Sequence, residues 1–159
     1  MDERLTPDFV MVRALEGIGE LSDKVWPLQP KKNAIAPFAF YIQTDDTEEE
    51  ALDRMTGLQH TGYALHVVSD TYYGLAVIGG HVKAAITALS GRSWARADSG
   101  VCDAAVSNEI VADTGGERLL IEDVSIRQVS PDLFEEDVFL YRRIYQIDMD
   151  YQTERSVST

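Results

Sequence analysis

The stretch that decides the fold is residues 60–89, HTGYALHVVSDTYYGLAVIGGHVKAAITAL. In its first ten residues Tyr63, Leu65 and Val67 share one face, the period of two that is typical of a strand. From Asp70, which we expect to cap a helix, the apolar period changes to three and four residues. The apolar face of that helix comprises Tyr72, Leu75, Gly79, Val82, Ile86 and Leu89. A strand that leads directly into such a helix predicts a helix packed on a sheet.

Two adjacent glycines, Gly79 and Gly80, lie in the middle of this predicted helix. Each glycine costs about 1 kcal/mol relative to alanine in an exposed helix interior. Close approach of a neighbouring element would explain them, and a kink in the helix is the alternative. The sequence leaves both explanations open.

A shorter helix is predicted upstream. Thr6 can cap its free amide groups, Pro7 suits the first helical position, and Asp8 complements the helix dipole. Its apolar stripe comprises Phe9, Val10, Val12 and Leu15, with Leu5 placed to contact Val10 and with Gly17 and Gly19 at its end.

Four further segments are predicted as strands. Residues 24–28 contain Pro27, which limits them to a sheet edge or a strand end, and we expect them to pair with residues 37–43. Residues 118–127 and 138–151 form two longer strands, and Ser130 starts the turn between them. One face of the last strand carries Phe139, Tyr141, Tyr145, Ile147, Met149 and Tyr151.

The order of these elements predicts an α+β fold, α-β-β-β-α-β-β, in which a single mostly antiparallel sheet of about five strands packs against two helices. The 159 residues fit one domain, 1–159. Residues 90–116 form a long excursion without a sustained period, with a short strand expected at 106–111. The C-terminal tail, residues 153–159, is expected to fray.

Charge and composition exclude several classes of protein. Asp and Glu number 27 against 14 Lys and Arg, so the net charge of −13 repels nucleic-acid phosphates and argues against specific DNA or RNA binding. No apolar run approaches the roughly 18 residues that a membrane span needs. The single cysteine, Cys102, cannot form an internal disulfide, and no signal sequence precedes the first helix, so we expect folding in a reducing cytoplasm.

Residues that could carry catalysis are scattered. His60, His66 and His81 lack partners at metal-ligand spacing, and nucleotide-binding, serine-nucleophile and paired-cysteine motifs are absent from the sequence. The acidic pairs 45–46 and 135–136 lie on predicted loops, where consecutive carboxylates rarely converge on one site. We therefore expect no catalytic residues, no metal site, no cofactor and no enzymatic activity.

An acidic run forms the segment between the second and third predicted strands. It contains Asp45, Asp46, Glu48, Glu49 and Glu50, and residues 51–55 after it could form one or two helical turns. A solvated connector and a functional loop are both compatible with this composition.

Six segments follow one another in order between residues 8 and 151. They are 12–15 (VRAL), 25–28 (VWPL), 36–41 (APFAFY), 63–68 (YALHVV), 82–86 (VKAAI) and 139–149 (FLYRRIYQIDM). Their order, and the spacing of the second and third, resemble the phage tail-completion, or head–tail joining, family of tail terminators.

The resemblance implies a virion structural protein without catalytic residues. Members form a homo-oligomeric ring, typically of six copies, that sits on the last layer of tail-tube protein, stops its growth and presents a surface to the head–tail connector protein. DNA passes through such a ring without specific binding. The expected location is the head–tail joint of the virion, after assembly in the host cytoplasm.

Two sets of residues are candidates for these contacts. Phe139, Tyr141, Tyr145 and Tyr151 on the long aromatic strand are candidates for the contact between copies, although they could equally complete the internal core. The five acidic residues of 45–50 are candidates to line the DNA channel or to face a neighbouring ring, since an acidic wall repels phosphates.

Two alternatives remain. A ring protein on the head side of the joint has the same general requirements. A small α+β ligand-binding domain is of a different class, and its pocket would lie between sheet and helices around His66 and His81.

Overall fold

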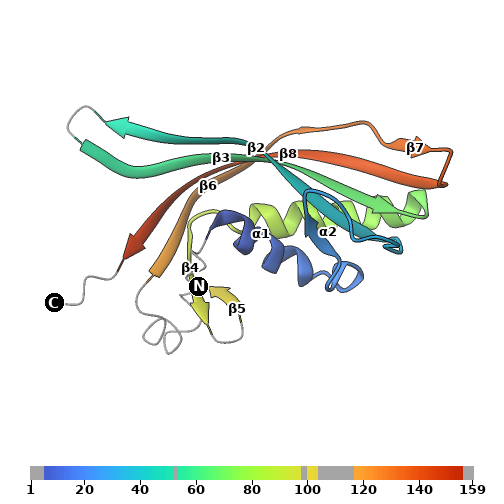
Figure 1. Cartoon of the computed structure of the whole chain (residues 1–159), viewed down its shortest axis with the longest axis horizontal. Helices are drawn as coiled ribbons and strands as arrows, with labels where there is room; N and C mark the ends of the chain where they lie inside the picture. The colour runs from blue at the N-terminus through green and yellow to red at the C-terminus, as the bar shows by residue number, and fades with distance from the viewer. Residues whose placement is uncertain (1–5, 52–53, 98–99, 104–116, 156–159) are drawn as a thin grey trace.

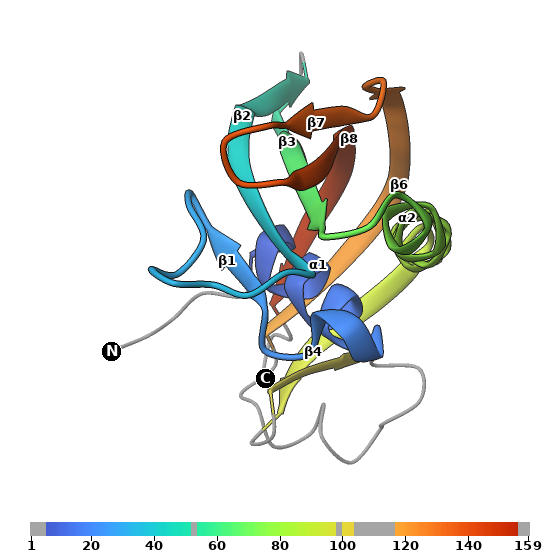
Figure 2. The ribbon, with the colours of Figure 1, turned by 90° about the vertical axis from the view of Figure 1, so that its right-hand side faces the viewer.

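The computed structural model describes residues 6–51, 54–97, 100–103 and 117–155, which form one curved sheet with two helices on its concave side (Figures 1 and 2). Along the sheet the strands follow the order β1-β2-β3-β8-β6-β4-β5, and β7 pairs with β8. All pairs are antiparallel except β1 with β2. The predicted α+β class is confirmed.

The elements have the following bounds: α1 Pro7–Glu16, the 3-10 helix η1 Gly19–Leu21, β1 Val25–Pro27, β2 Phe38–Ala51, β3 Arg54–Ser69, α2 Tyr72–Thr87, β4 Arg92–Ala97, β5 Gly100–Asp103, β6 Glu117–Val129, β7 Leu133–Glu135 and β8 Leu140–Arg155.

The five predicted strands correspond to β1, β2, β3, β6 and β8, and three short strands were not predicted. Two of them, β4 and β5, form a hairpin within the excursion 90–116, and the third, β7, follows the residues predicted as a turn. The strand expected at 106–111 lies outside the described residues. Short strands of this kind depend on pairing with a longer neighbour, here β6 or β8, so their own sequence carries no sustained period.

The acidic run was predicted as a connector or loop, and that prediction is wrong for its backbone. Residues 45–50 continue β2, which pairs with β3 as far as Ala51 opposite Arg54. The helical turns expected at 51–55 are likewise replaced by the ends of these two strands. Pairing with β3 overrides the low strand propensity of aspartate and glutamate. β2 and β3 thus form a long hairpin arm (Figure 1).

The last strand, β8, lies in the interior of the sheet between β3 on one side and β6 and β7 on the other. It begins at Leu140, two residues later than predicted, because Val138 and Phe139 belong to the turn after β7. Residues 153–155, which were expected to fray, pair with β6. Neighbours on both sides hold β8 in place over nearly its whole length.

Two register shifts in the pair β2–β3 and two in the pair β6–β8 mark β-bulges or similar irregularities that bend the sheet. They lie at Gln43/Asp45 and Glu48/Glu50 in β2, and at Ile121/Asp123 and Ile126/Gln128 in β6. A bulge bends its strand and increases the local twist, which curves the sheet around the helices.

Each helix buries one face against the sheet. In α1 the buried stripe contains Val10, Met11 and Leu15, whereas Phe9, predicted on it, is largely exposed and Val12 is half-buried. The predicted contact between Leu5 and Val10 lies outside the described residues. Thr6 is the N-cap by position, but its hydroxyl donates to the Asp8 carboxylate rather than capping an amide.

The face of α2 was predicted correctly except at its start. Leu75, Gly79, Val82 and Ile86 are buried with Leu89, while Tyr72 is exposed. The N-cap is Thr71, whose hydroxyl accepts a hydrogen bond from the Gly74 amide at 2.9 Å, so the prediction of Asp70 is wrong by one residue. Among the described residues, no helix is long and apolar enough to cross a membrane.

Candidate functional site

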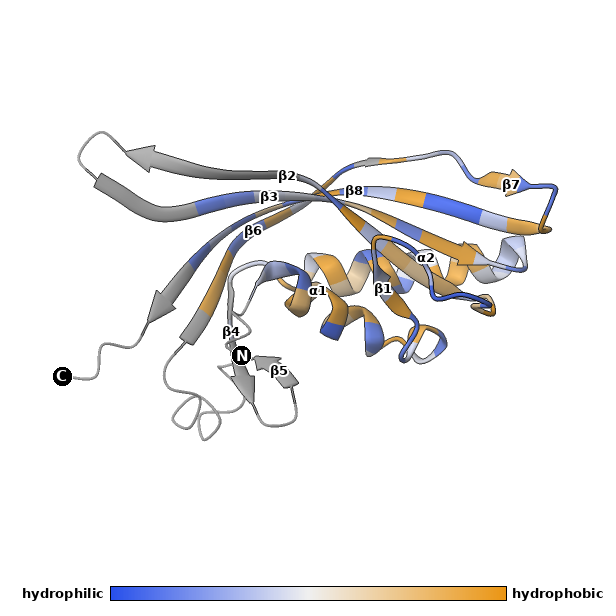
Figure 3. Ribbon diagram, viewed as in Figure 1, coloured by the Kyte–Doolittle hydropathy of each residue, from blue (hydrophilic) through white to orange (hydrophobic). Residues whose placement is uncertain are grey.

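A chain of four aromatic rings lies at one end of the molecule, where the hairpin β7–β8 meets the start of α2. The ring of Tyr72 lies 6.0 Å from that of Tyr141, which lies 4.8 Å from Phe134, which lies 6.3 Å from Phe139. We call these four residues the aromatic tip. Figure 3 colours parts of β7 and of the following turn as hydrophobic at this end of the sheet. Phe134 and Tyr72 were not predicted as site residues, and the apolar pair Leu133-Phe134 inside an acidic segment was the available signal.

Two ion pairs brace the aromatic tip. Arg143 binds Asp132 with two hydrogen bonds, Nε to Oδ1 at 2.6 Å and Nη2 to Oδ2 at 3.0 Å, and Arg142 pairs with Glu135. Bidentate pairing of this kind fixes the geometry of both groups. The hydrogen bonds from Arg143 hold the pKa of Asp132 below its usual value and raise the pKa of Arg143. Both basic groups beside the aromatic tip are therefore already neutralised.

Phe139 is the most exposed member of the aromatic tip. Its side chain is 73% exposed, and its backbone has φ of 53°, the left-handed region that L-residues with bulky side chains rarely adopt. The adjacent Val138 is 54% exposed, and Glu136 and Asp137 in the same turn are exposed. The turn of the hairpin thus presents an apolar knob, Val138 and Phe139, beside the exposed acidic side chains of Glu136 and Asp137.

The four residues predicted for the contact between copies fall into two groups. Tyr145 and Tyr151 are 2% and 9% exposed and belong to the core of their own chain, which was the alternative explanation. Because β8 lies inside the sheet, its edges are not open to another chain. Phe139 and the half-buried Tyr141 lie instead on the aromatic tip.

The acidic run lies along an open edge. β1 pairs with β2 only through Ala39, Phe40 and Tyr41, and in the described part of the chain no strand pairs with the outer edge of β2 beyond that point. From Ile42 to Ala51, the backbone groups on the outer side of β2 therefore have no described strand beside them. Asp45, Asp46, Glu48, Glu49 and Glu50 all belong to this edge.

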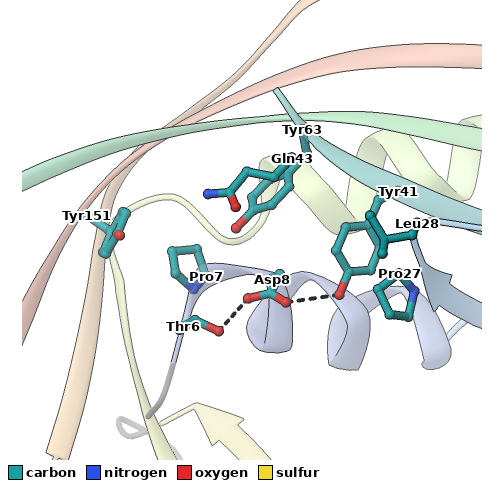
Figure 4. A pocket seen from close by; sticks show the side chains of 9 residues that line it. All are labelled: Thr6, Pro7, Asp8, Pro27, Leu28, Tyr41, Gln43, Tyr63 and Tyr151. Atoms are coloured by element: carbon teal, nitrogen blue, oxygen red, sulfur yellow. Dashed lines mark hydrogen bonds between the residues drawn. The ribbon is translucent and has the colours of Figure 1, made fainter. Parts of the chain in front are cut away.

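A half-open cavity of about 310 Å³ lies between the sheet and the start of α1 (Figure 4). Its lining comprises Thr6, Pro7, Asp8, Pro27, Leu28, Tyr41, Gln43, Tyr63 and Tyr151. The alternative of a ligand-binding domain placed its pocket around His66 and His81, and neither residue lines this cavity, since His66 stacks on Phe40 and His81 is exposed on α2.

Polar groups in the cavity are bonded to one another. The Tyr41 hydroxyl donates to the Asp8 carboxylate at 3.0 Å, and the Gln43 amide donates to the Thr61 hydroxyl at 3.1 Å. Burial, and then the neighbouring Asp8, raise the pKa of Tyr41, so its hydroxyl stays protonated and remains a donor. The rings of Tyr41 and Tyr63 meet edge to face at 5.7 Å.

The histidines lie apart from one another. His60 Nδ1 lies 2.7 Å from Asp150 and its Nε2 lies 3.4 Å from Asp148, which also pairs with Arg127. His66 stacks on Phe40 at 4.5 Å, and His81 is exposed on α2. Within the described residues, no group of three or more histidine, cysteine or acidic side chains has a geometry suited to a metal ion.

Comparison with known proteins finds similarity among solved structures. No protein-family model matches the chain, and no curated protein matches it. Among solved structures, a chain from the virion of a native gene transfer agent (GTA) particle is similar, with a TM-score of 0.43 and 16% sequence identity over 89% of this chain and 84% of that chain. Similarity at this level concerns the course of the backbone alone.

Proposed function

We propose that the chain is a structural protein of a phage-like particle and acts as the ring, of about six copies, that closes the tail tube at the head–tail joint. The order of its segments resembles the tail-completion family, and its surface offers two features suited to contacts with other proteins, the open edge of β2 and the aromatic tip. Its partners on this proposal are other copies of itself, the tail-tube protein and the head–tail connector protein. The virion is its site of action, after assembly in the host cytoplasm.

The open edge of β2 is the observation that carries the proposal. An unpaired strand edge is a template for pairing with another chain, and isolated soluble proteins protect such edges with charge or cover them. Here the edge runs for ten residues, from Ile42 to Ala51, and half of them are acidic. Charge of one sign opposes uncontrolled pairing between identical edges, while it leaves the edge available in a defined assembly.

The same arm supports an acidic channel. The hairpin β2–β3 extends beyond the helices (Figure 1), so that in a ring it can reach toward the axis. An acidic wall repels DNA phosphates and lets the DNA move without being held. In this proposal Asp45, Asp46, Glu48, Glu49 and Glu50 face the channel or the neighbouring ring.

A head-side connector ring would use the same two features, and the partner that the protein binds separates the two positions. In the terminator position the chain binds the tail-tube protein first, whereas in the head-side position it binds the head–tail connector protein first.

The mass of the purified protein in solution tests the proposal. Light scattering at low and moderate salt, on the protein alone and then with the tail-tube protein, should give a species of about six copies in at least one condition. Salt matters because copies with a charge of −13 repel each other until the charges are screened. A monomer or dimer in every condition would overturn the ring and favour a ligand-binding domain that uses the cavity beside α1.

A further inference from the structure

The cavity is large enough to admit one aromatic ring of the aromatic tip. A cavity of about 150 Å³ is large enough to hold a benzene ring, and this cavity measures about 310 Å³. Its wall is partly aromatic, since Tyr41 and Tyr63 line it and meet edge to face at 5.7 Å, the arrangement in which aromatic side chains pack. Its carboxylate, Asp8, already accepts hydrogen bonds from Thr6 and Tyr41, so an incoming apolar group does not leave it without partners.

The charges beside the two features are opposite in sign. Glu136 and Asp137 are exposed next to the knob of Phe139, whereas Lys31 and Lys32 are exposed in the loop that follows the cavity residue Leu28. Leu28 and Ile35 in that loop are 70% and 76% exposed, so the basic surface has apolar side chains of its own. An acidic apolar knob and a basic apolar rim are complementary surfaces.

The knob and the cavity of one molecule cannot meet each other. The hairpin β7–β8 forms one end of the molecule, and the cavity lies beside the start of α1 nearer its middle (Figures 1 and 4). The ion pairs of Arg142 and Arg143 hold β7 and the residues before it against β8, which is an inner strand of the sheet, and Tyr72 on α2 contacts Tyr141 of β8. A knob that cannot reach its own cavity is available to another copy.

We infer that Phe139 of one copy inserts into the cavity lined by Leu28, Tyr41 and Tyr63 of the next copy, with Glu136 and Asp137 against the partner's Lys31 and Lys32. This is a head-to-tail contact between different surfaces of identical chains, the kind that closes into a ring when its rotation returns to the start. The inference rests on the proposed ring and names the contact that holds it.

The conformation of Phe139 agrees with a role outside the monomer. Left-handed backbone is unfavourable for a residue with a Cβ, and glycine or asparagine is the usual choice at such a turn. A phenylalanine that is 73% exposed gives the monomer little burial in return. Strained positions of this kind occur most often at functional sites.

Two variants separate the halves of the contact. Phe139→Asn removes the knob with a residue that tolerates the left-handed backbone, and Gln43→Trp fills the cavity from its exposed rim. Tyr73→Asn is the matched control, because Tyr73 is 79% exposed on α2 outside the aromatic tip. Thermal unfolding monitored by circular dichroism verifies that each variant is folded.

Mixing the two variants gives the decisive measurement. Each alone should be monomeric by light scattering under the conditions in which the wild type and Tyr73→Asn form the ring. An equimolar mixture should give a dimer and nothing larger, since only the knob of Gln43→Trp and the cavity of Phe139→Asn remain. Rings formed by both single variants would overturn the inference and leave the proposed function standing.

A cross-link tests the contact even if the wild type is monomeric alone. In a Cys102→Ser background, Val138→Cys copies, which keep Phe139, mixed with Leu28→Cys copies under mild oxidation should give a disulfide-linked dimer at least tenfold faster than Tyr73→Cys mixed with Leu28→Cys. Equal rates would overturn the inference. Absence of a ring even with the tail-tube protein would overturn the proposed function separately.

Discussion

A Cβ atom at Gly79 would lie 2.5 Å from the hydroxyl oxygen of Tyr145, because α2 crosses β8 at this point. The same atom would also collide with the guanidinium of Arg143, which donates to that hydroxyl at 3.3 Å and is fixed by Asp132. Of the two explanations for the glycine pair, close approach therefore holds for Gly79. Around Gly80 the space is open.

The two glycines should respond oppositely to alanine. Gly80→Ala should raise the free energy of unfolding by up to about 1 kcal/mol through helix propensity. Gly79→Ala should lower it by about 1–2 kcal/mol, since the clash with two held side chains exceeds that gain. Urea unfolding measures both. In an Arg143→Ala background the cost at Gly79 should shrink, and an unchanged cost would show that Arg143 is not the obstacle.

Stability should fall as the pH drops through the usual histidine range. Burial, and then Arg142, hold the pKa of His66 below its ordinary value of 6.5, so the unfolded chain takes up this proton at a higher pH than the folded chain. The contribution of neutral His66 is therefore complete above about pH 6.5 and is lost below it, down to the lowered folded pKa. His66→Gln should flatten the unfolding midpoint across this window, whereas the exposed His81→Gln should not.

Phe139→Asn should fold at least as stably as the wild type. Relief of the left-handed phenylalanine should offset the lost contact with Phe134 and raise the free energy of unfolding by about 0.5–1 kcal/mol. Thermal and urea unfolding of the monomer measure it. A loss above about 1 kcal/mol would mean that the knob serves the monomer's own fold.

The charges beside the knob should determine the strength of association. Reversal of Glu136 and Asp137 to lysine should weaken association about fivefold at low salt, as expected for two exposed pairs. It does so although the chain becomes less negative overall, which by itself favours association. Lys31→Glu and Lys32→Glu in the same chain should restore the affinity. Analytical ultracentrifugation measures the association of the wild type, of the reversed variant and of the rescued variant. If the affinity is not restored, Glu136 and Asp137 do not pair with Lys31 and Lys32 across the contact.

The acidic edge should matter for DNA passage. With Asp45, Asp46, Glu48, Glu49 and Glu50 changed to lysine, particles that assemble should deliver DNA at least tenfold less efficiently, because the channel wall would hold phosphates. The control reverses the exposed Glu20, Glu122 and Asp123. If particles with the five-residue variant assemble and deliver DNA normally, these residues do not line the channel.

The spacing of apolar residues, together with the positions of helix-capping residues and prolines, was sufficient to predict the α+β class and the five main strands. The change from a period of two to a period of three and four at Asp70 predicted β3 and α2, and the proline in 25–28 predicted an end strand. Both signals reflect burial of one face of an element, which is a local property of the sequence.

The candidate contact surfaces were harder to predict because they depend on the order of the strands in the sheet. The same alternating tyrosines would suit an interface on an edge strand and a core on an interior strand, and only the pairing of β8 with β3 and β6 decides for Tyr145 and Tyr151. The aromatic tip joins Tyr72 to Phe134 across 61 intervening residues of the chain, so no short stretch of sequence contains it. The cavity likewise joins α1, β2, β3 and β8.

The interior position of β8 also governs when the chain can fold during synthesis. The arm β2–β3 and the unit β4–β6 have no strand pairing with each other, and residues 140–155 join them. A ribosome must therefore translate through β8 before the sheet can close, and such non-local pairing makes closure slow. A truncated copy that lacks β8 would remain two half-sheets with open edges, a target for proteases, and so would not enter the proposed ring, which one faulty copy would break.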